Sequence, residues 1–294
     1  MDKYGIFITA VELGSITAAA TELNYTQSGV SYAIAALEKE VGYTLIKRQK
    51  TGVSLTSKGE LFYPFILSIA NQKRRLEQEI DAMQNIIAGE LRLGSHASVT
   101  SVWLPSLLQQ FQELYPKVTI NLFNEDYREV ARLLEMGIID LAFLPEVTIT
   151  ESLRFIPLYN DHVYATLPCN HPLTKKASVT MDEFLSYPLI LPDNRDDSVI
   201  RKLMSRSEKT PSIRYVLQDD ISIVMLVEAG LGVSFLSGLY REICPAKVEF
   251  RPFDPPGDRM LGLATTKPVQ LTAVSKAFIE FVSSQDLAIL SKRT

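Results

Sequence analysis

The sequence is poor in cysteine, histidine and tryptophan. Its 294 residues contain two cysteines, Cys169 and Cys244, three histidines and one tryptophan. Two cysteines without a CxxC motif cannot form a disulfide framework. The histidines His96, His162 and His171 are isolated, with no HExxH or Cys/His ligand spacing and no triad pattern. We therefore expect no metal site and no cofactor.

Two further features are missing: an excess of basic charge and a long apolar run. The 30 Lys and Arg against 34 Asp and Glu give a net charge of −4, so any DNA affinity must be local. No stretch approaches the roughly 20 apolar residues of a membrane span. The N-terminus has no basic region of the kind that begins a signal peptide. We expect a cytoplasmic globular protein of two or three domains with no membrane partner.

Residues 1–58 alternate short helical patterns with tight breaks. Gly14 ends a first helix, and Ser15 or Thr17 offers an N-cap for a second. Thr26 is an N-cap for a third helical pattern, which Gly42 ends. Two helices with a short break form a helix-turn-helix. The run 44–56 then indicates two short strands around a basic turn, which is a wing.

Residues 59–90 carry the most regular apolar pattern of the chain. The stripe consists of Phe62, Ile66, Ile69, Lys73, Leu76, Ile80, Met83 and Ile87. Its steps of four and three residues are the heptad seam of a coiled coil, so the helix is expected to pair two subunits. Packing against its own C-terminal domain is the alternative. Ser57 and Glu60 have capping-box spacing, Gly89 is the expected end, and Pro64 should bend the first turns or move the helix start downstream.

Residues 91–294 alternate strand and helix patterns, which favours parallel sheets covered by helices. Two α/β series are visible. We expect a first lobe of about 91–161 and 266–294 and a second lobe of about 162–265. Strands crossing near Asp161 and Thr265 would join the lobes and leave a cleft between them.

A set of residues between positions 7 and 59 stands at the spacing of a known family. The matching positions are Phe7, Ala18, Ala19, Ala20, Leu23, Gln27, Ser28, Val30, Ser31, Ile34, Leu37, Glu38, Gly42, Leu45, Arg48, Leu55, Thr56 and Gly59. This run closely resembles the N-terminal domain of LysR-type transcriptional regulators. Leu104-Pro105, Tyr115-Pro116 and the run 229–237 look like the family's effector domain, so the resemblance covers essentially the whole chain.

The resemblance implies a fold class and an assembly. The expected class is α/β with an all-α N-terminal part: a winged helix-turn-helix, a long linker helix, and a two-lobed effector domain of the periplasmic-binding-protein type. The family forms dimers and, more often, tetramers. The implied partners are double-stranded DNA with an inverted-repeat operator, a small-molecule effector, a second copy of the chain, and RNA polymerase if the protein is an activator.

The helix after Thr26 carries the residues expected to contact DNA. The major groove admits one α-helix, whose first turns must present short polar groups to base edges. Gln27 suits a bidentate contact with adenine, and Tyr32 a phosphate or a thymine methyl. The family usually has a basic or polar residue at the position of Tyr32. The candidate DNA-binding residues are Thr26, Gln27, Ser28, Ser31, Tyr32, Lys47, Arg48 and Lys50. A surface helix without DNA and a solvated charge run are the alternatives.

The loop after the first strand of the third segment precedes a helix, where free backbone N–H groups suit an anion. The other cleft walls are implied by the resemblance. The candidate effector-binding residues are Ser95, His96, Ser98, Thr100, Asn124, Leu144, Pro192, Asp193 and Ile221. Ser98 or Thr100 could instead cap its own helix. Acidic residues near the expected mouth, Asp193, Asp219 and Asp220, disfavour a polyanion and could favour an amine.

Two other function classes stay open from the sequence. One is a small-molecule binding module with lost or weak DNA binding, because residues 1–58 have a net charge of only +1. The other is an enzyme, since α/β lobes have a cleft. No GxSxG, P-loop or other catalytic constellation is present, so we expect no enzymatic activity.

Overall fold

The computed structural model describes residues 2–49, 52–83, 86–192, 198–244, 246–267 and 271–290. They form two compact units. One comprises Met1–Ile86 with Met136–Ile138, and the other comprises Ile87–Glu135 with Ile139–Thr294. We refer to them as the N-terminal unit and the C-terminal unit.

The helices of the N-terminal unit begin at polar caps that the sequence supplies. The first three helices are α1 (Lys3–Glu12), α2 (Ile16–Glu22) and α3 (Gln27–Val41). Asp2, Ser15 and Thr26 each accept a hydrogen bond from a backbone N–H of the first turn, as N-caps do. Gly42 ends α3 in the left-handed conformation at φ 80°. The helices enclose a core that includes Phe7, Val30, Ile34 and Leu37, all fully buried.

The wing is the hairpin of β1 (Ile46–Gln49) and β2 (Gly52–Leu55). Two contacts fix it to the helices. The Glu38 carboxylate of α3 accepts hydrogen bonds from Leu45 N at 2.7 Å and Ile46 N at 3.2 Å. On the other strand, Val53 N donates to Gly14 O at 2.7 Å. The predicted helix-turn-helix and wing are therefore present, with the basic strand held beside α3.

The long helix α4 (Ser57–Met83) differs from expectation at both ends. Its N-cap is Thr56, whose hydroxyl accepts from Gly59 N at 2.9 Å, and not Ser57. The helix continues through Pro64, which is its eighth residue, so its start is not displaced downstream. Residues 86–88 are not helical, and Gly89 begins a strand instead of ending the helix.

The heptad assignment on α4 is wrong at two of its positions. Ile66 is 3% exposed and lies in the core of the N-terminal unit, so it is not available to a partner helix. Ile87 lies outside the helix and packs against the core of the C-terminal unit's first lobe. Phe62 is half-buried and stacks on Tyr43 with ring centroids 5.9 Å apart. The physical reason is that one side of α4 is needed to close the winged-helix core.

The first lobe of the C-terminal unit is built on parallel strands. They are β3 (Gly89–Ser95), β4 (Val118–Asn124) and β5 (Leu141–Pro145). The associated helices are α5 (Ala97–Val102), α6 (Leu104–Leu114), α7 (Tyr127–Glu135), α11 (Ala273–Ser283) and α12 (Leu287–Leu290). Trp103, Phe111, Phe143 and Phe278 are buried together, with ring centroids of Phe111 and Phe278 5.0 Å apart.

The second lobe has smaller elements around its own apolar cluster. Its strands are β7 (Leu189–Pro192), β8 (Ile213–Leu217) and β9 (Ser234–Ser237), and its helices are α8 (Met181–Phe184), α9 (Ser198–Met204) and α10 (Asp220–Glu228). Phe184, Phe235 and Phe253 pack as a triplet with centroid distances of 4.7 to 5.4 Å. The lobe therefore has a core separate from that of the first lobe.

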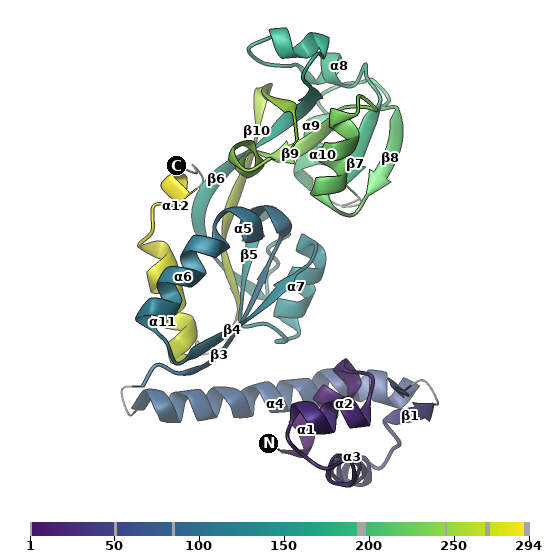
Figure 1. Cartoon of the computed structure of the whole chain (residues 1–294), viewed down its shortest axis with the longest axis vertical. Helices are drawn as coiled ribbons and strands as arrows, with labels where there is room; N and C mark the ends of the chain where they lie inside the picture. Colours follow the sequence, from purple (N-terminus) through teal and green to yellow (C-terminus); the bar gives the residue numbers. More distant parts are fainter. Residues whose placement is uncertain are drawn as a thin grey trace. The chain divides into compact units, whose positions relative to one another are not determined.

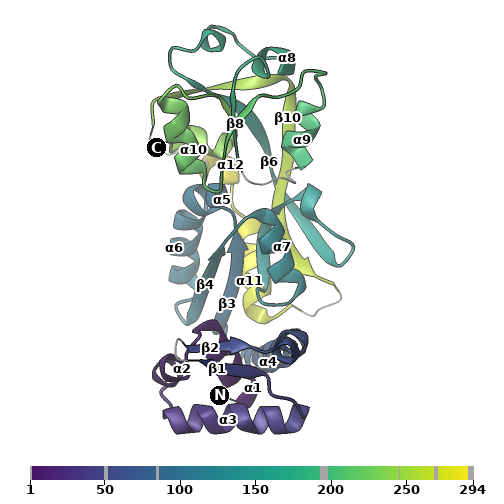
Figure 2. The ribbon, with the colours of Figure 1, turned by 90° about the vertical axis from the view of Figure 1, so that its right-hand side faces the viewer.

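Two long strands, β6 (Leu153–Pro168) and β10 (Val248–Thr266), run antiparallel from one lobe to the other (Figures 1 and 2). The sheet order β4-β3-β5-β10-β6-β9 shows that both lobes share them. Leu261–Ala264 of β10 pair with β5, so this stretch belongs to the first lobe. The expected boundary at 265 is therefore several residues late, because one unbroken strand carries the return crossing.

Within the described residues, no single helix is long and apolar enough to span a membrane. Only α1 and α2 together pass such a test, and they are bent by 119° and packed in the winged-helix core. The same residues contain no group of three His, Cys, Asp or Glu side chains arranged to hold a metal ion.

Candidate functional site

The first candidate surface is the N-terminal end of α3. Val30, Ile34 and Leu37 bury one face of this helix, so the opposite face points to solvent. Gln27 and Ser28 are exposed in the first turn, and Tyr32 is 78% exposed one turn later. Side chains on this face are free of the core and stand where base edges would be reached.

The hydroxyl of Thr26 and the side chain of Ser31 are less accessible to DNA than Gln27, Ser28 and Tyr32 are. The Thr26 hydroxyl accepts from Gly29 N at 3.1 Å and lies 3.1 Å from Ser28 Oγ, so it is engaged as the helix cap. Ser31 is half-buried. The backbone N–H groups of the first turn form the positive end of the helix dipole, which favours the binding of a phosphate.

The wing presents basic groups beside α3. Lys47 and Arg48 are both exposed on β1, while Ile46 before them is buried. The predicted Lys50 lies outside the described residues. A positively charged strand and a polar helix end are thus provided by the same unit, as phosphate positioning and base reading require.

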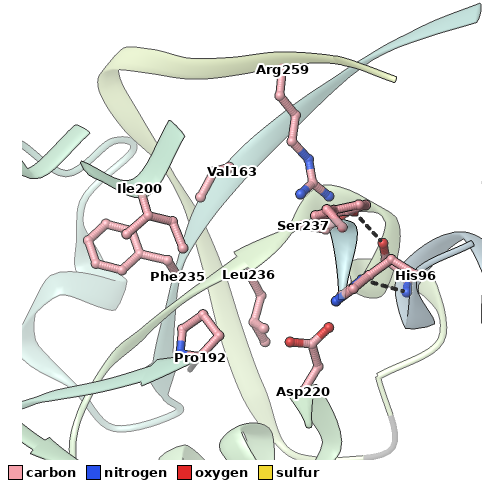
Figure 3. Close-up of a pocket in the computed structure, with 11 residues that line it drawn as sticks. His96, Val163, Pro192, Ile200, Asp220, Phe235, Leu236, Ser237 and Arg259 are labelled. Atoms are coloured by element: carbon pink, nitrogen blue, oxygen red, sulfur yellow. Dashed lines mark hydrogen bonds between the residues drawn. The ribbon is translucent and has the colours of Figure 1, made fainter. Parts of the chain in front are cut away.

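The second candidate site is a cavity in the C-terminal unit lined by residues of both lobes (Figure 3). Its volume is about 30 Å³, room for water-sized groups only, since one buried water needs roughly 10–15 Å³. The polar lining residues are His96, Ser98, Tyr127, Asp220, Ser237 and Arg259. The apolar ones are Val163, Pro192, Ile200, Phe235 and Leu236. The lobes must separate before a larger molecule can enter.

A buried ion pair stands where the crossing strands pass between the lobes. Arg259 on β10 is 7% exposed and Asp161 on β6 is 2% exposed. The guanidinium approaches one carboxylate oxygen of Asp161 at 2.8 Å, and the Ser237 hydroxyl donates to the same oxygen at 2.7 Å. Because each charge is neutralised by the other, the pair can remain buried.

The first lobe contributes a stacked aromatic pair to the cavity wall. The His96 ring lies over Tyr127 with centroids 4.5 Å apart and an interplanar angle of 26°. His96 is also the N-cap of α5, since its Nδ1 accepts from Ser98 N at 3.5 Å. Neither Ser98 nor Thr100 caps the helix, so that alternative is wrong. The Ser98 hydroxyl instead lies 3.5 Å from the Tyr127 hydroxyl.

The second lobe contributes Asp220, the first residue of α10. Its neighbour Asp219 is the N-cap and accepts from Ser222 N at 2.7 Å, which holds the pKa of the Asp219 carboxyl below its usual value. Tyr240 lies behind Asp220 and is 5% exposed. Burial, reinforced by the nearby Asp220 carboxylate, raises the pKa of Tyr240 far above its usual value, so this hydroxyl stays protonated.

Only some of the predicted effector-binding residues line the cavity. His96, Ser98 and Pro192 line the cavity. Ser95, Thr100 and Asn124 do not, although they form a hydrogen-bonded chain with Ser95 Oγ 2.5 Å from Thr100 Oγ1 and Thr100 2.9 Å from Asn124.

Leu144, Ile221 and Asp193 complete the predicted set. Leu144 is fully buried in the central strand β5, so the prediction that it lines the cleft is wrong. Ile221 is 61% exposed and is not among the lining residues, because it points away from α10 toward solvent while Asp220 before it lines the cavity. Asp193 lies outside the described residues.

Sequence reasoning missed Tyr127, Ser237 and Arg259. Arg259 follows a Pro-Pro-Gly run and was not distinguishable from a surface cation, and only its register opposite Asp161 reveals its burial. Ser237 ends the buried strand β9, whose position next to the first lobe depends on tertiary pairing with β6. Tyr127 begins α7 after a short polar turn, a position for which the sequence offers no signal.

A winged helix-turn-helix and a two-lobed α/β unit with a polar cleft define a class of protein: a DNA-binding regulator with a ligand-binding domain. Comparison with known families identifies the class further. Residues 1–60 match the bacterial regulatory helix-turn-helix protein model of the lysR family. Residues 84–286 match the LysR substrate binding domain. The chain therefore belongs to the LysR family of DNA-binding transcriptional regulators, which is not an enzyme family.

Full-length relatives show the same organisation. The chain is 27% identical over 278 residues to the uncharacterized HTH-type transcriptional regulator YvbU of Bacillus subtilis, with 94% of each chain covered. HinK, a LysR family regulator from Pseudomonas aeruginosa, is 27% identical with a TM-score of 0.62 over 96% of this chain and 97% of HinK. CbnR in complex with its target DNA shares the fold at 21% identity, with a TM-score of 0.67 over 95% and 97% of the two chains.

Proposed function

We propose that this chain binds an inverted-repeat operator as a homodimer or homotetramer, with the first turns of α3 in successive major grooves, and that a small molecule in the cleft changes this binding. The observation that carries the proposal is the exposed polar end of α3, with Gln27, Ser28 and Tyr32 opposite a fully buried face. Lys47 and Arg48 contact flanking phosphates. CbnR, which has the same fold, was solved on its target DNA.

Charge explains why several subunits are needed. Each phosphate contact contributes a slope of about −0.9 to the dependence of log K on log salt, so a head with three or four contacts binds weakly. Residues 1–58 have a net charge of only +1. Paired heads bind as one ligand with a high effective concentration, and their spacing selects an inverted repeat. As a DNA-bound regulator the protein acts in the cytoplasm, and it contacts RNA polymerase where it activates.

Ligand control requires two arrangements of the C-terminal unit. A molecule changes DNA binding only through the difference between its affinities for those arrangements. The small cavity volume of about 30 Å³ supports an equilibrium with a more open form, because an organic effector needs more room. Subunit packing then transmits the lobe movement to the DNA-binding heads.

Gel-shift titration of the full chain with DNA from upstream of its own gene tests the proposal. Gln27→Ala should weaken specific binding by about 10- to 100-fold for each head that reads a half-site, the value of one bidentate base contact, and leave nonspecific binding unchanged. Lys47→Ala should weaken both equally and reduce the magnitude of the salt slope by about 0.9 for each DNA-bound head, which is about 1.8 for a dimer.

Lys175→Ala is the matched control, because it removes the same charge from an exposed position of the second lobe. It should leave both affinities as they are. A chain that retards no DNA at low salt, or a Gln27→Ala variant that keeps full specificity, would show that this surface does not read DNA. The chain would then be a ligand-binding module.

A further inference from the structure

We propose that the cleft takes a small organic cation, a molecule with an amine or amidine nitrogen, and discriminates against carboxylates and phosphates. The inference rests on the proposed ligand site and names the charge of its ligand. It follows from which charged side chains are paired among the described residues that line the cavity.

Arg259 is the cation of the cavity wall, and its charge is already compensated. Its guanidinium approaches Asp161 at 2.8 Å through both Nε and Nη2, and both side chains are more than nine-tenths buried. The Tyr127 ring lies against the other side of the guanidinium, 5.6 Å from its carbon to the ring centroid. An incoming carboxylate would have to displace Asp161, which would leave a buried carboxylate without its partner, at a large free-energy cost.

His96 is held at the start of its own helix, where its Nδ1 accepts a hydrogen bond from Ser98 N. Ser98 and Tyr127 of the first lobe and Ser237 of the second lobe supply hydroxyl groups. The described lining residues of the first lobe therefore offer hydrogen-bonding groups and no carboxylate.

Asp220 is the uncompensated charge. Its carboxylate enters the cavity from the wall opposite the Arg259 guanidinium (Figure 3). Among the described residues, no lysine, arginine or histidine forms an ion pair with Asp220. The buried, protonated Tyr240 hydroxyl beside it can donate a hydrogen bond but cannot neutralise it. Arg259 is paired with Asp161, so Asp220 is the carboxylate without a cationic partner among the described residues that line the cavity.

Asp220, which would bind the cationic nitrogen, and the hydrogen-bonding groups of the first lobe would lie on opposite sides of one bound molecule. Such a ligand bridges the two lobes, so its binding favours the closed arrangement over the open one. Closure in turn removes water from the carboxylate and strengthens its attraction to the cation. Charge recognition and lobe closure are thereby coupled at a single residue of α10.

Three nearly isosteric probes separate charge from shape: acetamidinium, acetamide and acetate. Each is added to the full chain at matched ionic strength, and the melting temperature is followed by fluorescence of Trp103, the only tryptophan. Ligand that binds the folded form raises this temperature. The expected order is a clear rise with acetamidinium, a smaller one with acetamide and none with acetate.

Asp220→Asn should weaken acetamidinium binding by about tenfold or more, the value of one charge-assisted hydrogen bond. Asp219→Asn is the matched control. It removes a charge from the adjacent position, which does not line the cavity, and asparagine caps a helix as well as aspartate does. Acetamidinium should stabilise this variant as it stabilises the parent chain.

A larger response to acetate, an equal response to all three probes, no response to any, or a response to acetamidinium that survives Asp220→Asn would each overturn the charge assignment. The gel shift without ligand is independent of these outcomes. A chain that retards DNA but prefers acetate disproves only the cationic class of ligand. A chain that is stabilised by acetamidinium but retards no DNA disproves only the regulator proposal.

Discussion

Asp161 and Arg259 meet on the two strands that connect the lobes, so a single pair of side chains determines whether this connection can stay buried. Arg259 is paired in register with Asp161, and Ser237 donates to the same carboxylate oxygen at 2.7 Å. Three polar groups from β6, β9 and β10 thus interact directly with one another. Removing one member leaves the others unsatisfied in a dry environment.

Asp161→Ala should therefore lower the free energy of unfolding of the C-terminal unit by about 3–5 kcal/mol, the usual cost of leaving a buried charge unpaired. Urea unfolding of the full chain, followed by Trp103 fluorescence, measures this change. Asp258→Ala is the control, because Asp258 neighbours Arg259 on the same strand but its side chain is 53% exposed, so its loss should cost less than about 1 kcal/mol. Equal effects of the two substitutions would refute the assigned role of the buried pair.

At the scale of single residues, the sequence predicted those positions whose roles are local. Thr26 as N-cap and Gly42 as left-handed C-cap both depend only on the residues beside them, and the structure confirms both. The cleft depends on strand pairing between distant segments. Arg259 and Asp161 are 98 residues apart, and no local pattern indicates that they meet. The prediction for Leu144 came from the family resemblance, and the structure instead buries this side chain fully in β5.

The helix α4 packs against the winged-helix core with one side and exposes apolar side chains on the other. The residues that close the winged-helix core, such as Ile66 and Leu67, occupy one side. The other side exposes a continuous apolar stripe of Leu61, Phe65, Ile69, Leu76, Ile80 and Met83, from 46% to 85% exposed. Gln72, also exposed, fills the one gap.

This stripe advances by steps of 4, 4 and 3 residues, so positions 61, 72 and 83 are equivalent. An 11-residue repeat has about 3.67 residues per turn, more than the 3.5 of a heptad coiled coil. Partner helices are then expected to cross with little or right-handed supercoiling. The heptad seam predicted from sequence lies on the core-facing side at Phe62 and Ile66 and on the exposed side from Ile69 to Met83, because apolar spacing alone does not distinguish a core-facing stripe from a partner-facing one.

Leu76→Asn should separate the subunits. The substitution removes about 2 kcal/mol of apolar burial from each of two helices, which raises the dimer dissociation constant at least about 100-fold. Sedimentation velocity at micromolar concentration measures the assembly, and DNA affinity should fall with it. Glu77→Asn places the same residue at the next position, at the edge of the exposed arc, and should leave the assembly intact. An unchanged sedimentation coefficient for Leu76→Asn would show that another surface joins the subunits.

Across the whole molecule, the two units have separate cores and separate tasks. The core of the N-terminal unit is formed by its helices and wing, while Trp103 and its aromatic neighbours belong to the C-terminal unit. Because the chain has one tryptophan, its fluorescence reports the C-terminal unit alone, whereas circular dichroism near 222 nm reports the helices of both. Unfolding followed by both signals therefore tests whether the two units unfold together, because one signal reports the C-terminal unit and the other reports both units.

Leu37→Ala provides that test, because Leu37 is fully buried in α3 of the N-terminal unit. The substitution should lower the free energy of unfolding by about 2–5 kcal/mol, and only the winged-helix core should be destabilised. Circular dichroism should then develop an early urea transition while the Trp103 transition keeps its midpoint. Leu263→Ala, in the core of the first lobe, should move the Trp103 transition instead. If either substitution shifted both transitions equally, the units would be one cooperative structure, and binding in the cleft could alter DNA affinity through folding stability alone, without any rearrangement of subunits.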